Sequence, residues 1–257
     1  MTAKKECRLY DVIVVGCGGT GGFFIKEFAR FMASNKYQVN FQIRLIMIDG
    51  DRVESSNLDR QSFMPEDVGR FKCSVFSEAI ESCFSVKSYA IGQYLDTADQ
   101  LHKIITSLRE WPFYSKDTIP ILVGCVDNHR ARQVLHEYYY RYVDTGFYFD
   151  AANEFSNGEV VFSHKENGEM LSPPRGFFFP EVLSDDSPRR SEESCGAINE
   201  HAPQHIATNM QAAQILLAKI CNLIMSNSFK PGIVYFDAME NQMIFNAWTK
   251  GRKKKKA

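Results

Sequence analysis

Short apolar runs alternate with segments of helical periodicity over the first 142 residues. Residues 11–15 (Asp-Val-Ile-Val-Val) are apolar except for the first and run into glycines, which predicts a buried strand. Residues 20–33 carry large apolar side chains at helical spacing and predict a helix. The same alternation predicts further strands at 41–48, 86–91 and 119–126, and further helices at 72–84 and 128–142. This order is typical of an α/β fold with a mostly parallel sheet and right-handed crossovers.

The pattern changes after residue 142. Residues 164–204 are rich in Pro, Gly, Ser and charge and show no clear periodicity, so we expect a long irregular loop of the kind that is often functional or disordered. Around this loop the sequence predicts strands at 147–151 and 159–163 about Asn157-Gly158, a long apolar helix at 205–225, and closing strands at 232–236 and 243–248. We therefore expect antiparallel strands to extend the parallel sheet.

We find neither an internal repeat nor a convincing linker, and the sequence favours one domain over residues 1–257. Residues 11–142 form its nucleotide-binding half on this interpretation, and residues 143–249 a half for partner binding and dimerisation. Residues 250–257 are a basic tail. Six of the seven residues from Lys250 to Lys256 are basic, which is typical of a solubilising end or of a contact with an acidic partner.

Composition excludes several classes of protein. The chain has 44% hydrophobic and 24% charged residues, which is ordinary globular usage. Thirty basic against 31 acidic residues give a net charge of −1, so we expect no bulk nucleic-acid binding. No apolar run reaches the roughly 18 residues of a membrane span, and Met1 to Cys7 lack the apolar stretch of a signal peptide. We expect a cytoplasmic protein without a membrane segment.

The cysteine pattern agrees with that compartment. Seven cysteines occur, an odd number, and none belongs to a Cys-x-x-Cys pair. This disfavours a disulfide framework and a thiolate zinc site, and it suits a reducing cytosol. We expect no zinc.

The first candidate site is the segment Gly16-Cys-Gly-Gly-Thr-Gly-Gly22 between the first predicted strand and helix. Gly16, Gly18, Gly19 and Gly21 would let the backbone approach a phosphate, and the helix N-terminus supplies free N–H groups. Tight strand–helix packing alone could also explain the glycines. Asp49 closes the second strand, where an acid can accept hydrogen bonds from ribose hydroxyls. A nicotinamide-dependent dehydrogenase would need little more than these residues.

The stretch beyond Asp49 separates the alternatives. Asp51, Asn57, Arg60, Gln61 and Lys72 follow the carboxyl end of the second strand, where nucleotides bind in open α/β sheets. Two cations and two amides suit a polyphosphate that gains charge during attack at its α-phosphorus. The other interpretation is a charged surface loop.

Four segments resemble, in the correct order, motifs of the ThiF/MoeB and ubiquitin-activating E1 superfamily. They are Gly16-x-Gly-Gly-x-Gly-Gly22, Asp49-x-Asp-x-Val-x-x-Ser-Asn-Leu-x-Arg-Gln61, Val68-Gly-x-x-Lys72 and Cys125-Val-Asp-Asn128. The resemblance covers residues 11 to about 225 and is looser after 145. Asp150-Ala-Ala-Asn-Glu, the Gly158-Glu-Val strand and Ser194-Cys-Gly-Ala197 look most like the ThiF-like proteins of bacterial PRTRC gene systems.

The resemblance implies a Rossmann-like ATP-binding domain and a set of roles. Asp49 resembles the ribose-binding acid, and Asn57, Arg60 and Lys72 resemble the triphosphate-binding set, with Gln61 beside them. Asp127 resembles the magnesium ligand, a role that suits a hard carboxylate. A buried Asp127 that caps the following helix is the alternative. The implied reaction is attack on ATP by the C-terminal carboxylate of a ubiquitin-like or sulfur-carrier protein, which yields an acyl-adenylate and pyrophosphate.

Cys195 ends the irregular segment, where some family members carry the thiol that accepts the acyl group. His201 or His205 could serve as its base, and a structural role for Cys195 is equally consistent with the sequence. An E2-like protein is another possible acceptor. Cys17 and Cys125 lie within the nucleotide motifs and are expected to pack, and Cys221 is expected in the core.

Family members usually work as dimers, and the long apolar helix offers more hydrophobic surface than one small sheet face needs, so we expect a homodimer. Family dimers often insert an arginine from an N-terminal segment into the partner's active site. Only Arg8 precedes the first strand here, so the resemblance does not extend to that arginine. Phe177-Phe-Phe179 could dock the partner's tail or fold back onto the domain. An oxidoreductase would leave Asn57, Arg60, Lys72 and Asp127 without a task, and a non-catalytic nucleotide-binding scaffold remains a further alternative.

Overall fold

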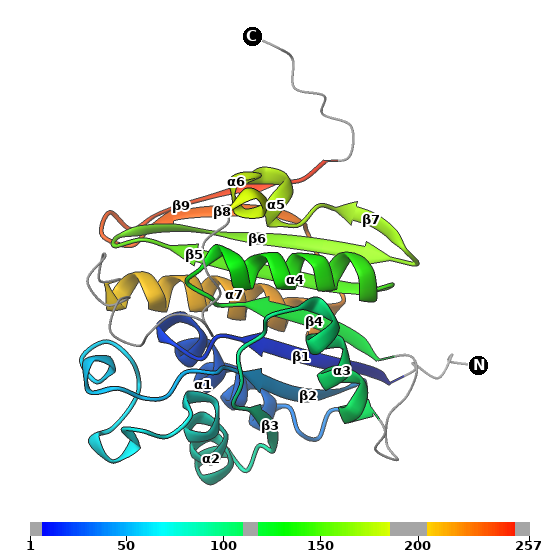
Figure 1. The fold of residues 1–257 in the computed structure, drawn as a ribbon. Helices are drawn as coiled ribbons and strands as arrows, with labels where there is room; N and C mark the ends of the chain where they lie inside the picture. The colour runs from blue at the N-terminus through cyan, green and yellow to red at the C-terminus, as the bar shows by residue number, and fades with distance from the viewer. Residues whose placement is uncertain (1–6, 110–117, 186–204, 250–257) are drawn as a thin grey trace.

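The computed structural model describes residues 7–109, 118–185 and 205–249. Its sheet has the strand order β3-β2-β1-β4-β5-β6-β8-β9, and β7 pairs with β6 off this path (Figure 1). The strands are β1 (Arg8–Val15), β2 (Phe41–Ile48), β3 (Ser88–Ile91), β4 (Ile119–Gly124), β5 (Gly146–Asn153), β6 (Asn157–Glu166), β7 (Glu169–Ser172), β8 (Gly232–Asp237) and β9 (Gln242–Ala247). In sheet order, the five strands β3, β2, β1, β4 and β5 pair in parallel. The remaining pairs are antiparallel, as the sequence predicts.

Helices cover both faces of the parallel part of the sheet. The helices are α1 (Gly19–Ser34), α2 (Lys72–Phe84), α3 (Ala98–Arg109), α4 (His129–Tyr142), α5 (Arg175–Phe178), α6 (Glu181–Ser184) and α7 (Ile206–Ser226), with 3-10 turns η1 (Ser55–Asn57) and η2 (Pro65–Asp67). Helices α1, α2 and α7 bury one apolar cluster against the sheet, and α3 and α4 bury a second cluster on the opposite face. The central strands read as continuous apolar runs because both of their faces are covered.

The crossovers place two strand ends at a topological switch point. Strand β1 has β2 on one side and β4 on the other, so the connections after β1 and β4 leave in opposite directions. Ligands of open α/β sheets bind in the crevice at the carboxyl ends of such strands. Strand β1 starts near the N-terminal label in Figure 1, so its carboxyl end lies at the left, beside the loop between β2 and α2.

The structure corrects three expectations about local structure. Helix α3 was not predicted, although Ala98, Leu101 and Ile105 form a buried stripe and Thr97 accepts a bond from the Gln100 amide at its start. Asn157-Gly158 is not a turn but the first part of β6, and the turn precedes it at 154–156. The segment 164–204 is not wholly irregular, since it contains the end of β6, then β7, α5 and α6.

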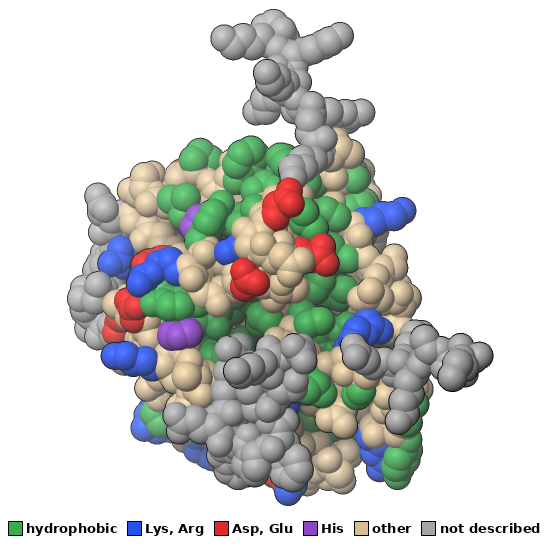
Figure 2. All heavy atoms as spheres, turned by 90° about the vertical axis from the view of Figure 1, so that its right-hand side faces the viewer, with side chains coloured by type: hydrophobic (Ala, Val, Ile, Leu, Met, Phe, Trp, Pro, Cys, Tyr) green, Lys and Arg blue, Asp and Glu red, His purple; other side chains and the backbone are tan. Residues whose placement is uncertain are grey.

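Among the described residues, no large patch of one charge lies on the side of the molecule at the amino ends of the parallel strands (Figure 2). Figure 2 shows acidic and basic side chains interspersed over that side, with hydrophobic side chains between them. None of the described helices is long and apolar enough to cross a membrane.

Candidate functional site

The glycine loop joins β1 to α1 and has a conformation that only small residues allow. Gly16 has a φ of +91°, and a Cβ atom there would lie 2.5 Å from the carbonyl oxygen of Cys125. A Cβ at Gly21 would overlap the carbonyl of Gly16. Helix α1 begins at Gly19 with no side chain capping it and no acidic residue in its first turn. Its first N–H groups and its positive dipole end are therefore available to an anion.

Asp49 follows β2 directly and is bonded to the glycine loop. One carboxylate oxygen accepts the Cys17 N–H at 2.6 Å, and the other accepts the Asp51 N–H at 2.8 Å. Burial raises the pKa of Asp49 to about 6, the Asp51 carboxylate adds to the shift, and the Lys72 ammonium opposes it. Each oxygen keeps a further lone pair, so the position suits the acceptance of ribose hydroxyls.

Lys72 begins helix α2 and lies inside the molecule. Its side chain is 7% exposed, and its Nζ is 2.9 Å from Oδ2 of Asp51. The Tyr94 hydroxyl donates to the other Asp51 oxygen at 2.7 Å. Asp51 thus holds the lysine next to Asp49, at the carboxyl edge where a polyphosphate would lie. The pair was not foreseen, because sequence reasoning placed both residues on the nucleotide individually.

The loop of the Ser-Asn-Leu-x-Arg-Gln motif lies against the glycine loop. Asn57 is buried, and its side-chain oxygen accepts the Glu54 N–H at 3.0 Å, so it fixes the turn η1. Arg60 is half-buried. The Gln61 amide nitrogen would be 3.9 Å from a Cβ at Gly18. Oε1 of Gln61 is buried without a hydrogen-bond partner among the described residues, as expected for a group that completes its bonding with a ligand.

Asp127 lies three residues after the end of β4 and is exposed. The capping alternative is wrong for this residue, because Asn128 caps helix α4 by accepting the Ala131 N–H at 2.8 Å. Within the described part of the chain, no three His, Cys, Asp or Glu residues form a group that could hold a metal ion. Magnesium commonly takes only one or two protein carboxylates together with substrate phosphates, so a single exposed carboxylate after β4 is compatible with that ion.

Two polar clusters at the same sheet edge escaped the sequence analysis. Asn209 of α7 accepts bonds from Thr20 at 3.1 Å and from Asn153 at 2.9 Å, which ties α7 to the head of α1. The second cluster joins the ends of β4 and β5. It comprises Arg132, Tyr148, Asp150, Glu159 and Arg175, and we call it the Asp150 cluster. Arg132 lies at helical spacing with the buried Leu135 and Tyr139, and a charge on that apolar stripe was the available signal.

The cysteines of the nucleotide motifs have buried thiols rather than activated ones. Cys17, Cys73 and Cys125 are largely enclosed, and burial raises the pKa of each of these thiols. Cys17 is buried and Cys125 packs against the core, as expected, and so does the half-buried Cys221. Cys195 and His201 lie outside the described residues. The His205 ring instead accepts the Ala207 N–H at the start of α7.

Other side chains singled out from the sequence make contacts within this chain. The Arg8 guanidinium donates to the Ile224 carbonyl at the end of α7 in its own chain. Phe177 is 60% exposed, yet its ring and that of Phe178 pack edge-on against Trp248, so this segment folds back onto the domain.

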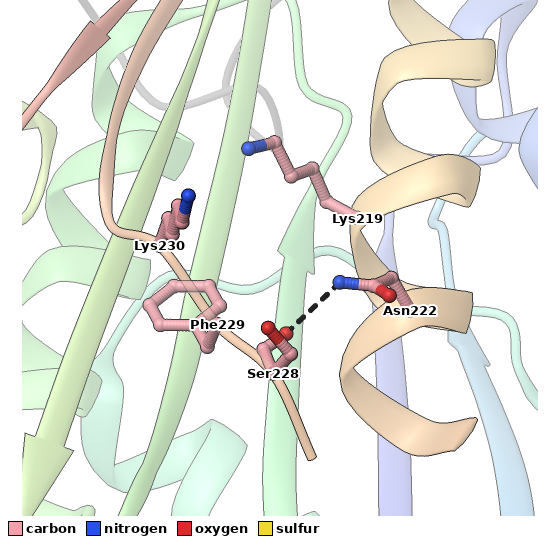
Figure 3. A pocket seen from close by; sticks show the side chains of 5 residues that line it. All are labelled: Lys219, Asn222, Ser228, Phe229 and Lys230. Atoms are coloured by element: carbon pink, nitrogen blue, oxygen red, sulfur yellow. Dashed lines mark hydrogen bonds between the residues drawn. The ribbon is translucent and has the colours of Figure 1, made fainter. Parts of the chain in front are cut away.

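A cavity of about 280 Å³ lies at the C-terminal end of α7 (Figure 3). It is lined by Lys219, Asn222, Ser228, Phe229 and Lys230. Asn222 is 13 residues beyond Asn209 on the same helix, which is roughly 20 Å from the glycine loop. This cavity is therefore separate from the glycine loop.

The fold is that of an open α/β sheet with a glycine loop at the β1/β4 switch point, the place where such sheets bind nucleotides. Residues 2–257 match the ThiF family, and the chain belongs to this family. The Ubiquitin-like modifier-activating enzyme 5 of Dictyostelium discoideum is 25% identical over 134 residues, 52% of this chain and 33% of that protein. The same enzyme of Oryza sativa subsp. japonica is 25% identical over 137 residues, 52% and 30% of the two chains. The matched region spans about a third of these relatives.

Solved structures show the same fold. Escherichia coli MccB, determined with AMPCPP and MccA, superposes with a TM-score of 0.61 at 18% identity, over 95% of this chain and 65% of that one. PaaA gives a TM-score of 0.62 at 16% identity, over 93% and 72% of the two chains. MccB has also been determined with ATP. The parallel sheet extended by antiparallel strands agrees with these neighbours.

Proposed function

We propose that this chain uses ATP to adenylylate the C-terminal carboxylate of a small protein or peptide, of the ubiquitin-like or sulfur-carrier type. The observation that carries the proposal is the convergence at one sheet edge of the uncapped α1 N-terminus, Asp49, the Lys72–Asp51 pair and Asp127. Membership of the ThiF family and the ATP-bound and MccA-bound MccB structures support it.

The residues would divide the work by position. Asp49 would accept from the ribose, which places the base on the β2 side, and the glycine loop would bind the α-phosphate through N–H groups. Lys72 and Arg60 would meet the outer phosphates, with Asn57 and Gln61 shaping the loop beside them. The phosphates would compete with Asp51 for the Lys72 ammonium.

The reaction then needs little from the protein beyond alignment and charge. A carboxylate oxygen of the substrate forms a bond to the α-phosphorus while the bond from that phosphorus to the bridging oxygen breaks, and pyrophosphate leaves with the electron pair. The protein's cations and N–H groups would stabilise the charge that develops on the phosphate oxygens. Asp127 would hold magnesium, which supplies Lewis-acid neutralisation of the phosphates when bound.

Exchange of labelled pyrophosphate into ATP tests the proposal. The candidate substrates to be assayed are small proteins with a C-terminal Gly-Gly. Wild type is expected to catalyse exchange only with such a substrate. Asp127→Asn should abolish exchange at an unchanged melting temperature, because the side chain is exposed and does not cap α4. Asp144→Asn is the control, since Asp144 is exposed near the start of β5, away from the crevice.

Each other outcome has a definite meaning. Exchange retained by Asp127→Asn would remove Asp127 from the mechanism, and loss of folding would assign it a structural role. Binding of ATP without exchange for any substrate tested would favour a nucleotide-binding scaffold. Binding of NAD more tightly than ATP would favour an oxidoreductase and overturn the proposal.

Transfer of the acyl group to Cys195 is a separable second step of the proposal. The Cys195 thiolate would attack the adenylate's carbonyl carbon and release AMP. We expect Cys195→Ser to keep pyrophosphate exchange and to lose any reductant-sensitive adduct with the partner, whereas Cys83→Ser, on the exposed side of α2, should keep both. An adduct that survives Cys195→Ser would place the acceptor elsewhere.

A further inference from the structure

Arg132 is a buried cation that bridges the segment after β4 and the part of β5 that no longer pairs with β4. Strands β4 and β5 pair as far as Gly124 and Asp150. Past that point Nη2 of Arg132 donates to the Val126 carbonyl at 2.6 Å and to the Ala151 carbonyl at 3.2 Å. The residue is 6% exposed. The guanidinium thus joins the two segments where β4 and β5 no longer pair, beside Gly16 of the glycine loop.

Asp150 fixes the guanidinium from the other side. Its Oδ1 lies 3.4 Å from Nε of Arg132 and 3.2 Å from Nε of Arg175, and its Oδ2 accepts the Tyr148 hydroxyl at 2.7 Å. Arg175 also pairs with Glu159. The two cations and two carboxylates balance in charge, and Asp150 and both arginines are almost fully enclosed.

Such a cluster is an expensive way to stabilise a fold. Desolvation of buried ions offsets much of their attraction, and well-packed apolar residues often give equal stability. A planar guanidinium can instead hold several acceptors in a fixed arrangement. The cluster therefore makes more sense as a device that sets geometry than as a source of stability.

The geometry it sets is that of Asp127. The carbonyl of Val126 belongs to the peptide unit that leads into Asp127, and this unit is planar, so fixing its oxygen fixes the direction in which Asp127 starts. On the other side Asn128 is fixed by its bond from the Ala131 N–H. The exposed Asp127 side chain is thus presented from a backbone held at both neighbours.

We propose that Arg132, backed by Asp150 and Arg175, is a positioning residue that orients Asp127 for the magnesium–nucleotide complex. The inference rests on the proposed function. Arg132 touches neither nucleotide nor metal in this account and acts only through the Val126 peptide. Partners of this kind that orient a metal ligand typically change metal affinity by about 10-fold to 100-fold when they are removed.

Calorimetric titration of ATP, with magnesium and then with a chelator, tests the inference without any acyl substrate. Wild type is expected to bind ATP more tightly with magnesium. Arg132→Met should lose at least about 10-fold of that magnesium-dependent gain while its affinity for AMP in chelator stays near the wild-type value. Arg141→Met is the matched control on the same helix, because Arg141 pairs at the surface with Asp99 and Glu137. It should keep the full gain.

Further variants keep the inference falsifiable. Arg132→Lys retains the charge beside Asp150 but cannot span both carbonyls, so it should also lose part of the gain, and it carries the test if Arg132→Met does not fold. A folded Arg132→Lys or Arg132→Met protein with the wild-type gain would overturn the inference. Asp127→Asn separates the two proposals: if it keeps the gain, the magnesium assignment fails, and if only the Arg132 variants keep it, the positioning role alone fails.

Discussion

Each carboxylate oxygen of Asp49 accepts one backbone N–H, from Cys17 of the glycine loop and from Asp51 of the next loop. The residue orders the glycine loop, and under the proposed function its remaining lone pairs would accept the ribose hydroxyls. Burial and the neighbouring Asp51 carboxylate place its pKa at about 6. Both functions depend on the ionised form, which makes the residue sensitive to mild acid.

We expect adenosine binding to weaken as the pH falls below about 6, because protonation of Asp49 removes an acceptor for the ribose hydroxyls. Adenosine is the probe because phosphate groups titrate in the same range. In the unliganded protein, the pH dependence of the free energy of unfolding has the opposite sign to that of adenosine binding. The raised pKa favours the protonated folded state, so the free energy of unfolding falls as the pH rises through about 6.

Calorimetry of adenosine binding between pH 5 and pH 8 checks this expectation. Each unit by which adenosine lowers the pKa of Asp49 corresponds to about 1.4 kcal/mol of binding free energy. Asp49→Asn should bind more weakly and lose the pH dependence. A wild-type affinity that is flat across this range would contradict the ribose assignment.

At the scale of elements, the sequence predicted the longest periodic helices but missed α3, despite its buried stripe, and the two four-residue helices α5 and α6. Helices α1 and α7 carry apolar stripes over 16 and 21 residues and were predicted within one residue. Helices α5 and α6 have four residues each, too few for any period to show. They are held instead by Arg175 and by the Gln133 amide, which donates to the Val182 and Asp185 carbonyls.

The contact between α1 and α7 leaves no room for a side chain at Gly19. A Cβ at Gly19 would meet the Asn209 amide, which is 2% exposed and held by Thr20 and Asn153. We expect Gly19→Ala to lower the free energy of unfolding by about 1–3 kcal/mol through overpacking. In the Gly19→Ala/Asn209→Ala double variant the clash is absent, so the two effects should not add.

Denaturant unfolding of the two single variants and the double variant gives the coupling energy. Costs that add within about 0.5 kcal/mol would show that the two side chains do not meet. That result would contradict the packing of α7 on the glycine loop.

At the scale of the whole molecule, the sequence allowed the residues of the candidate site to be predicted, but not the long-range contacts that hold the surrounding structure together. The motif residues lie in the first 128 positions, and the βαβ rhythm alone brings their loops to one edge of the sheet. The pairing of β6 with β8 and the burial of Asp150 between two arginines join residues far apart in the chain. No local pattern encodes such contacts, because they depend on how the second half packs.

A homodimer stays a prediction, but β9 rather than α7 is now the expected contact surface. The apolar side of α7 is buried within the chain against α1, β5 and β6, so it does not demand a partner. Strand β9 lies at the sheet edge and exposes Met243 and Ile244 by 51% and 60%. Apolar edge strands favour pairing with another chain.

Light scattering at tens of micromolar should therefore give the mass of a dimer. Ile244→Lys should shift the mass toward the monomer, since a charge at the strand edge opposes pairing. A monomeric wild type would contradict the expectation, and a dimer that persists in Ile244→Lys would place the interface on another surface.

The central claim is that a substrate carboxylate attacks the α-phosphorus of ATP. The most direct measurement incubates the protein and a small Gly-Gly-terminated protein with ATP labelled either at the α-phosphate or at the γ-phosphate, and follows both labels. The α-label is expected to join the substrate as an acid-stable, hydroxylamine-sensitive adenylate while the γ-label leaves in pyrophosphate. Release of the γ-label as orthophosphate, or its transfer to the substrate, would contradict attack at the α-phosphorus.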